Sequence, residues 1–333
     1  MYRILEGDIR DQLQNIEPAS IQTVITSPPY WGLRDYGVVG QLGLEPTPEE
    51  YVVNLVEVFR GVKRVLRDDG TVWLNLGDSY ANSAATSGGC SPKSTLGGGG
   101  GKYRDGSKNE AMFNNSSLRK IDHGLKPKDL VGIPWLVAFG LRADGWYLRS
   151  DIIWHKPNPM PESVTDRPTK SHEYIFLLSK SRKYYYDAEA VREPIKESNK
   201  GFISARARTA AGALGGENQH NMERRGYAEI KGANKRSVWT VSTQPYPGAH
   251  FATFPPKLIE PCILAGSKQG DTVLDPFAGS GTTLWVAEQN GRDSVGIELN
   301  SEYIEIIKQR MDNMQVNLFM QGVQQCATKN YPK

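Results

Sequence analysis

The feature that most constrains the fold is a short apolar strand that runs directly into two closely spaced glycines. The strand is Asp271–Phe277, the glycines are Gly279 and Gly281, and a helical pattern follows over residues 281–289. Because glycine has no Cβ, the backbone can turn tightly and approach a ligand here. The free N–H groups at the start of the helix can bind a carboxylate. The segment predicts a strand–turn–helix unit of an α/β protein with a small-molecule site at the turn.

Apolar strands and helical patterns alternate along both ends of the chain. Short strands are expected at 2–8, 23–27 and 71–76, with an amphipathic helix at 47–66 between the second and third. A helix at 130–141 and strands at 147–154 and 173–178 follow, and the pattern resumes with a helix at 255–267, a strand at 294–298 and a helix at 302–311. Such alternation predicts an α/β fold with a mostly parallel sheet.

A second motif, Thr26-Ser27-Pro28-Pro29-Tyr30-Trp31, ends the buried strand at 23–27. Its residues suit an aromatic amine, whose nitrogen is a poor nucleophile because its lone pair is delocalised into the ring. The Ser27 hydroxyl and the Pro28 carbonyl, held by the stiff Pro28-Pro29 backbone, can accept hydrogen bonds from the two amine hydrogens. Tyr30 offers a flat ring on which an extruded base could stack.

An acidic residue, Glu298, closes the strand after the glycine turn. Its separation from the turn is near the roughly 20 residues expected for a carboxylate that binds ribose hydroxyls. A dinucleotide site is the competing interpretation, but Leu284 stands where that motif requires a third glycine.

The charge is unevenly distributed. The 333-residue chain has a net charge of +3, whereas residues 82–126 hold seven Lys and Arg against three Asp and Glu, and residues 196–240 hold nine against four. Both segments are rich in glycine and lack periodicity. A mildly acidic body with two basic segments favours contacts with phosphates.

Together, in this order, the two motifs resemble the β group of DNA amino-methyltransferases, which use S-adenosylmethionine. Leu5-Glu6-Gly7-Asp8, Lys170–Tyr174 and His250–Leu258 are similar to further segments of that family. The resemblance implies a doubly wound, mostly parallel, seven-stranded, Rossmann-like sheet that is circularly permuted and carries an inserted DNA-recognition module. It implies a catalytic set of Ser27, Pro28, Pro29 and Tyr30. It implies a cofactor-binding set of Asp8, Asp275, Phe277, Gly279, Gly281, Thr282 and Glu298.

The resemblance also divides the chain. The catalytic domain is expected over residues 1–190, with a flexible insertion at 82–126, and over the cofactor-binding part at 246–314. A target-recognition module is expected at 191–245 and a tail at 315–333. The expected DNA contacts are Arg206, Arg208, Arg224, Arg225, Lys235 and Arg236.

Serine at position 27 resembles the cytosine-N4 subgroup, so the predicted reaction is methyl transfer to N4 of a flipped cytosine in double-stranded DNA. Three alternatives remain open. They are an adenine-N6 enzyme of the same group, an RNA or protein amide methyltransferase, and a DNA-binding module without catalysis. A cognate restriction endonuclease is a possible partner.

The cysteines favour neither a metal site nor carbon-5 chemistry. None of Cys90, Cys262 and Cys326 lies in a CxxC spacing. Pro261-Cys262 is similar to the Pro-Cys of cytosine carbon-5 enzymes, but its helical apolar spacing predicts a packed core residue. No apolar run is long enough to span a membrane, and the charged N-terminus differs from a signal peptide, so a cytoplasmic protein is expected.

Overall fold

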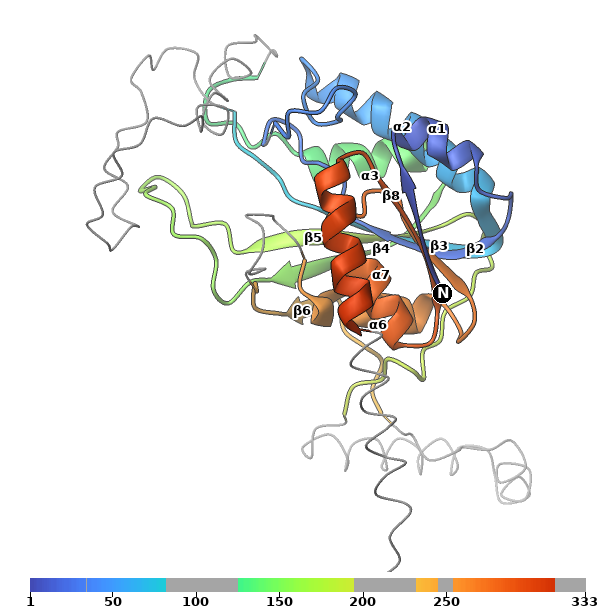
Figure 1. The fold of residues 1–333 in the computed structure, drawn as a ribbon. Helices are drawn as coiled ribbons and strands as arrows, with labels where there is room; N and C mark the ends of the chain where they lie inside the picture. The colour runs from blue at the N-terminus through green and yellow to red at the C-terminus, as the bar shows by residue number, and fades with distance from the viewer. Residues whose placement is uncertain (34, 82–124, 195–231, 245–253, 315–333) are drawn as a thin grey trace, which may run out of the picture.

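The computed structural model describes residues 1–33, 35–81, 125–194, 232–244 and 254–314. These residues form one eight-stranded sheet with helices on both faces (Figure 1). The strand order is β1-β8-β7-β2-β3-β5-β4-β6. The strands are β1 (Tyr2–Glu6), β2 (Ile21–Thr26), β3 (Leu66–Leu76), β4 (Tyr147–His155), β5 (His172–Ser179), β6 (Val238–Thr240), β7 (Thr272–Asp275) and β8 (Asp293–Glu298).

The sheet confirms the predicted mostly parallel α/β fold, with one strand more than the seven expected. β1, β8, β7, β2 and β3 are parallel, whereas β5 is antiparallel to both β3 and β4. The additional strand, β6, lies at the edge of the sheet and pairs in parallel with β4. Its three residues alternate exposed, buried and exposed, and the buried Trp239 packs against Trp73. A single buried side chain is too short a pattern to predict a strand from sequence.

One face of the sheet is covered by α1 (Ile9–Gln14), α2 (Pro48–Val65) and α3 (Ile133–Ala143) (Figure 1). The predicted helix at 47–66 is α2: Thr47 caps it by accepting from the Glu50 N–H, and Pro48 occupies the first turn. Its apolar stripe, including Tyr51 and Phe59, is fully buried. The six-residue α1 was not predicted, because only two of its side chains are buried and no periodicity can be read from them.

The other face is covered by α6 (Pro256–Gly266) and α7 (Thr282–Gln289). Cys262 in α6 is 1% exposed, and burial raises the pKa of its thiol. The prediction that Cys262 is a core residue is therefore confirmed. A helix at 301–314 packs Ile307 and Met311 against Ala278 and Leu284 beside β1.

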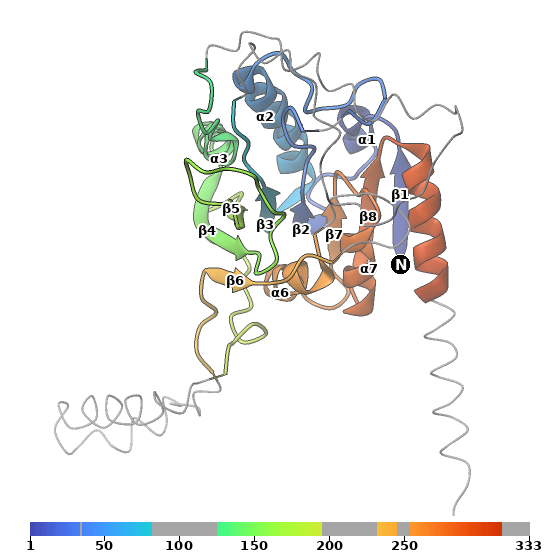
Figure 2. The same ribbon diagram turned by 90° about the vertical axis from the view of Figure 1, so that its left-hand side faces the viewer.

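The sheet order brings the two sequence motifs together. β2 carries the Pro-Pro turn and β7 carries the glycine turn, and the two strands pair in parallel through Thr23–Val273 and Val24–Leu274. Because their carboxyl ends meet at the same edge, the two turns lie side by side (Figure 2). β1 and β8 end at this edge as well.

Candidate active site

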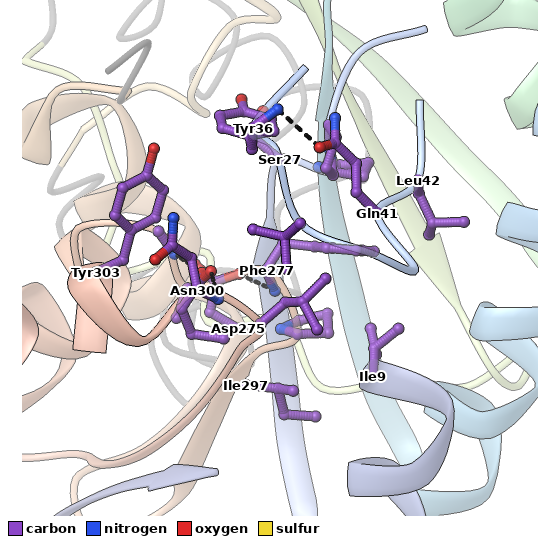
Figure 3. Close-up of a pocket in the computed structure, with 18 of the residues that line it drawn as sticks. Ile9, Ser27, Tyr36, Gln41, Leu42, Asp275, Phe277, Ile297, Asn300 and Tyr303 are labelled. Carbon is purple, nitrogen blue, oxygen red and sulfur yellow. Dashed lines mark hydrogen bonds between the residues drawn. The ribbon is translucent and has the colours of Figure 1, made fainter. Parts of the chain in front are cut away.

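A pocket lies at the carboxyl ends of β1, β8, β7 and β2 (Figure 3). Ten of the eleven residues predicted for catalysis and cofactor binding line it: Asp8, Ser27, Pro28, Pro29, Tyr30, Asp275, Phe277, Gly279, Thr282 and Glu298. The wall also includes residues that the sequence did not single out, among them Ile9, Tyr36, Gln41, Leu42, Ile297, Asn300 and Tyr303.

The two glycines of the turn serve different purposes. Gly279 has a φ of +52°, and a Cβ placed there would meet nothing closer than the Phe277 carbonyl oxygen at 4.0 Å, so the space in front of it is open. Gly281 has a φ of +74°, and its Cβ would come within 3.0 Å of Ile307. Gly281 does not line the pocket. The prediction that Gly281 contacts the cofactor stays a prediction, and in the structure this glycine allows the turn to pack against the helix at 301–314.

The carboxylate of Glu298 braces the glycine turn. One oxygen accepts from the Gly279 N–H at 2.8 Å and the other from the Asn300 N–H at 2.9 Å. Burial is the main cause that raises the pKa of Glu298. A carboxylate offers about four acceptor positions, so each oxygen can take a further hydrogen bond from the pocket side. That capacity suits a ribose diol.

Asp275 accepts three hydrogen bonds from the protein. Its carboxylate accepts from the Thr26 hydroxyl at 2.7 Å, the Thr283 hydroxyl at 2.6 Å and the Phe277 N–H at 3.1 Å. Burial raises its pKa to about 6. These contacts join β2, β7 and α7 beneath the pocket, so Asp275 shapes the site.

The pocket as a whole fits a nucleoside cofactor. Figure 3 shows Ile9, Leu42 and Ile297 as apolar side chains on one side and Asn300 and Tyr303 on another. An apolar slot for a flat base, beside carboxylates that can accept hydrogen bonds from ribose hydroxyls, is what a nucleoside requires. Asp8, at the end of β1, lines the rim while it also caps α1 through the Arg10 N–H.

On the acceptor side, the carbonyl groups of Pro28 and Pro29 differ in whether the protein already donates a hydrogen bond to them. The Pro29 carbonyl accepts from the Tyr51 hydroxyl at 2.7 Å, and Tyr51 is fully buried. The Pro28 carbonyl accepts no hydrogen bond from any residue that the structure describes. Pro28 and Ser27 therefore remain as the acceptors that can face a substrate.

Tyr30 is fixed by two polar residues from neighbouring strands. Its hydroxyl donates to Glu173 of β5 at 2.7 Å and accepts from Asn75 of β3 at 2.7 Å. Its ring packs against Gly77, where a Cβ would approach to 2.5 Å. Burial raises the pKa of Tyr30 well above its usual value, and the Glu173 charge adds to this effect.

Sequence reasoning missed Asn75 and Glu173 as members of the site. Asn75 is 4% exposed and is the polar residue in the otherwise apolar end of β3. A buried polar residue near the end of a strand is a signal that could have found it. Glu173 lies in a segment that resembles the family, but its partner Tyr30 is 143 positions away.

The predicted DNA contacts are placed only in part. Lys235 and Arg236 both pair with Glu193, at 3.8 and 2.8 Å, and the Arg236 side chain is 68% exposed. Arg206, Arg208, Arg224 and Arg225 lie outside the described residues, as does most of the predicted insertion at 82–126. Across the described part of the chain there is no cluster of metal-ligating side chains, and no helix there could cross a membrane.

Comparisons with known proteins agree with this geometry. The DNA methylase family matches residues 21–309. The Type II methyltransferase M.SmaI of Serratia marcescens is 47% identical over 309 residues, which cover 93% of this chain and 90% of the relative. The Type II methyltransferase M.Cfr9I of Citrobacter freundii is 46% identical over 315 residues, covering 95% and 89%.

Solved structures share the fold. PvuII DNA methyltransferase (cytosine-N4-specific) has a TM-score of 0.58 at 19% identity, covering 93% of this chain and 86% of that one. The Thermus thermophilus protein TTHA0409, complexed with S-adenosyl-L-methionine, has a TM-score of 0.53 at 23% identity, covering 93% and 94%. From the family match and the extent of the similarity to its relatives, the chain belongs to the N6/N4 DNA methylase family, which transfers methyl groups from S-adenosylmethionine to amino groups of DNA bases.

Proposed function

We propose that this protein methylates the exocyclic N4 of a flipped cytosine at a specific sequence in double-stranded DNA. The observation that carries the proposal is the joining of Ser27 and Pro28 with the glycine turn at Gly279 in one pocket. A base inside a duplex is out of reach of such a pocket, so the target base has to be extruded.

The acceptor side prepares the amine. The Ser27 oxygen and the Pro28 carbonyl accept the two amine hydrogens, which draws the nitrogen from a planar toward a tetrahedral shape. The Tyr51 hydroxyl fixes the adjacent Pro29 carbonyl and so holds the turn in place. Tyr30 supports the base with its ring. When bound, S-adenosylmethionine supplies the electrophilic methyl group.

On the cofactor side, Glu298 would hold the ribose and Asp8 the adenine of S-adenosylmethionine. Phe277, Gly279 and Thr282 form the adjoining wall, and Thr282 is held by a hydrogen bond from Arg310 at 3.0 Å. Asp275 acts from beneath by positioning the two turns. The order of the motifs along the chain supports assignment to the circularly permuted β group.

Serine at position 27 supports cytosine as the target, and adenine N6 is the alternative within the family. The test is to incubate unmethylated DNA with the protein and S-adenosylmethionine, digest it to nucleosides and analyse them by mass spectrometry. N4-methylcytosine is the expected product. N6-methyladenine would overturn the assignment of the base, and labelling of RNA or protein instead would favour the amide methyltransferases. DNA binding without any transfer would indicate a module that lacks catalysis.

Target recognition is assigned to the basic segment between residues 191 and 245, with further phosphate contacts from residues 82–126. Because DNA contacts release counterions, binding should weaken steeply with salt. An exchange of residues 196–231 with the matching segment of a relative leaves β6 and the Glu193–Ala233 bridge intact. If the exchanged protein is active and methylates an unchanged sequence, recognition lies elsewhere.

The relatives that are named Type II methyltransferases support a cognate restriction endonuclease as a partner of this protein in the cell. Such an endonuclease would cut DNA at the sequence that this protein methylates. The check is to map the methylated sequence and then ask whether DNA methylated there resists an endonuclease from the same source.

A further inference from the structure

A row of hydrogen-bonding groups runs from the pocket into the sheet behind the acceptor turn. The Ser27 hydroxyl lies 3.4 Å from the Tyr30 hydroxyl, which in turn donates to the Glu173 carboxylate at 2.7 Å. Lys156 pairs with the other oxygen of Glu173, and both side chains are less than one fifth exposed. The row thus begins at a pocket residue and ends at a largely buried ion pair.

The Glu173 carboxylate at the end of the row determines which way the hydroxyl protons of Tyr30 and Ser27 point. An ionised carboxylate only accepts hydrogen bonds, so the Tyr30 proton must point to Glu173. The Tyr30 oxygen is then left as an acceptor, for the Asn75 amide at 2.7 Å and for the Ser27 hydroxyl at 3.4 Å. With its proton turned inward, the Ser27 oxygen presents lone pairs to the pocket.

We infer that Glu173 is a positioning residue that fixes the Ser27 hydroxyl as a hydrogen-bond acceptor toward the substrate amine. The inference rests on the proposed function, in which Ser27 contacts that amine. A serine hydroxyl can rotate and can donate as readily as it accepts. A donated proton would compete for the amine lone pair that attacks the methyl group.

Asn75 is oriented by the same carboxylate. Its amide nitrogen approaches Tyr30 at 2.7 Å, Glu173 at 3.0 Å and Ser27 at 3.4 Å. Turning the amide over would place its oxygen against the carboxylate and the Tyr30 oxygen, which are both acceptors. The buried Asn75 oxygen has no partner among the described residues, which is the cost of keeping the amide in this orientation.

The Ser27–Tyr30 contact, at 3.4 Å, is the longest link of the row. Hydrogen bonds of catalytic groups are often long before substrate is bound and tighten in the complex. Burial and the Glu173 charge both raise the pKa of Tyr30, so its hydroxyl keeps the proton that links the two ends of the row.

The test is Glu173→Gln, which keeps the size of the side chain but can donate to Tyr30 and so removes the fixed direction. We expect kcat for DNA methylation to fall about tenfold or more. The KM for DNA and the calorimetric affinity for S-adenosylmethionine should stay within about twofold, because the substitution does not change the residues assigned to binding DNA or the cofactor. Glu305→Gln is the matched control: Glu305 is an exposed residue paired with Lys308, and kcat should be unchanged.

A second variant tests the orientation of the Ser27 hydroxyl independently of whether Glu173→Gln folds. Tyr30→Phe removes the link without disturbing the Lys156 pair, and it should lower kcat to a similar extent. The double variant should lose no more than the larger single loss, because both changes break one row. Additive losses, or an unchanged kcat in Glu173→Gln or Tyr30→Phe, would overturn the inference. If Glu173→Gln does not fold, the kcat of Tyr30→Phe decides alone.

The activity of the wild-type protein distinguishes a failure of this inference from a failure of the proposed function. A wild-type protein that forms no methylated amino base contradicts the function itself. An active wild-type protein with an unimpaired Glu173→Gln variant contradicts only the role of Glu173.

Discussion

The carboxylate of Asp275 accepts a 2.7 Å hydrogen bond from the hydroxyl of Thr26, although the two residues are 249 positions apart. Thr26 precedes the acceptor turn and Asp275 precedes the glycine turn. The Thr283 hydroxyl of α7 donates to the same carboxylate. This buried group therefore sets the spacing between the part of the site that holds the amine and the part that holds the cofactor.

Asp275 should give stability a pH dependence opposite to that of most carboxylates. Burial raises its folded-state pKa to about 6, whereas the unfolded value is about 4. Between these pH values the folded state binds the proton and the unfolded chain does not, so the free energy of unfolding falls as pH rises from about 4 to about 6. Asp275→Asn abolishes this titration.

The measurement is urea unfolding of the wild type and Asp275→Asn at several pH values. Relative to the variant, the wild type should lose roughly 2–3 kcal/mol between pH 4 and pH 7. The comparison cancels the titration of all other groups. A difference that does not vary with pH would show that Asp275 titrates normally in the folded protein.

Tyr51→Phe should destabilise the protein and slow catalysis. It removes the donor to the Pro29 carbonyl and leaves that half-buried acceptor unpaired, at a cost of about 1 kcal/mol. Tyr147→Phe, at a side chain that is 45% exposed, is the matched control and should cost little. Urea unfolding and kcat measured on both variants check the prediction. Equal stabilities of the two variants would mean that the Tyr51 hydroxyl does not hold the turn.

Glu298→Gln should weaken the binding of S-adenosylmethionine in the absence of DNA. The amide has one acceptor oxygen in place of two, and it cannot brace both Gly279 and Asn300 while it accepts from a ribose. A loss of roughly 1.5–3 kcal/mol in calorimetric binding is expected. Glu302→Gln, in the first turn of the next helix, is the control, and an affinity that is the same in both variants would refute the role of Glu298.

Gly281→Ala should lower stability through two separable effects. The methyl group would meet Ile307 at 3.0 Å, and a φ of +74° strains any residue with a Cβ. The crowding comes from the two γ carbons of Ile307, so in an Ile307→Ala background the loss caused by Gly281→Ala should be smaller, while the backbone strain of about 1–2 kcal/mol remains. Thermal unfolding of the wild type, the single variants and the double variant checks this. An equal loss in both backgrounds would show that packing against Ile307 is not the constraint.

Cys262→Ala should remain an active amino-methyltransferase. The thiol is buried in α6, and burial raises its pKa, so it is not available as a nucleophile. The variant should lose some stability from the small cavity but should still yield the same methylated base by mass spectrometry. A folded variant without turnover would indicate carbon-5 chemistry.

The sequence by itself determined the local chemistry of the site. The residues of the two turns, the capping of α2 by Thr47 and the apolar strands on either side are local patterns, and local patterns can be read from neighbouring residues. The same holds for Cys262, whose helical spacing predicted its burial. These features account for the fold class and for ten of the residues that line the pocket.

Only the tertiary structure decided how distant residues share the site. Glu173 reaches Tyr30 because β5 runs antiparallel to β3, and no spacing along the chain encodes that pairing. Gly281 faces Ile307 because the helix at 301–314 packs behind the turn. Contacts of this kind are determined by the order and direction of the strands. That order depends on the packing of the whole core and not on the residues that neighbour each contact in the sequence.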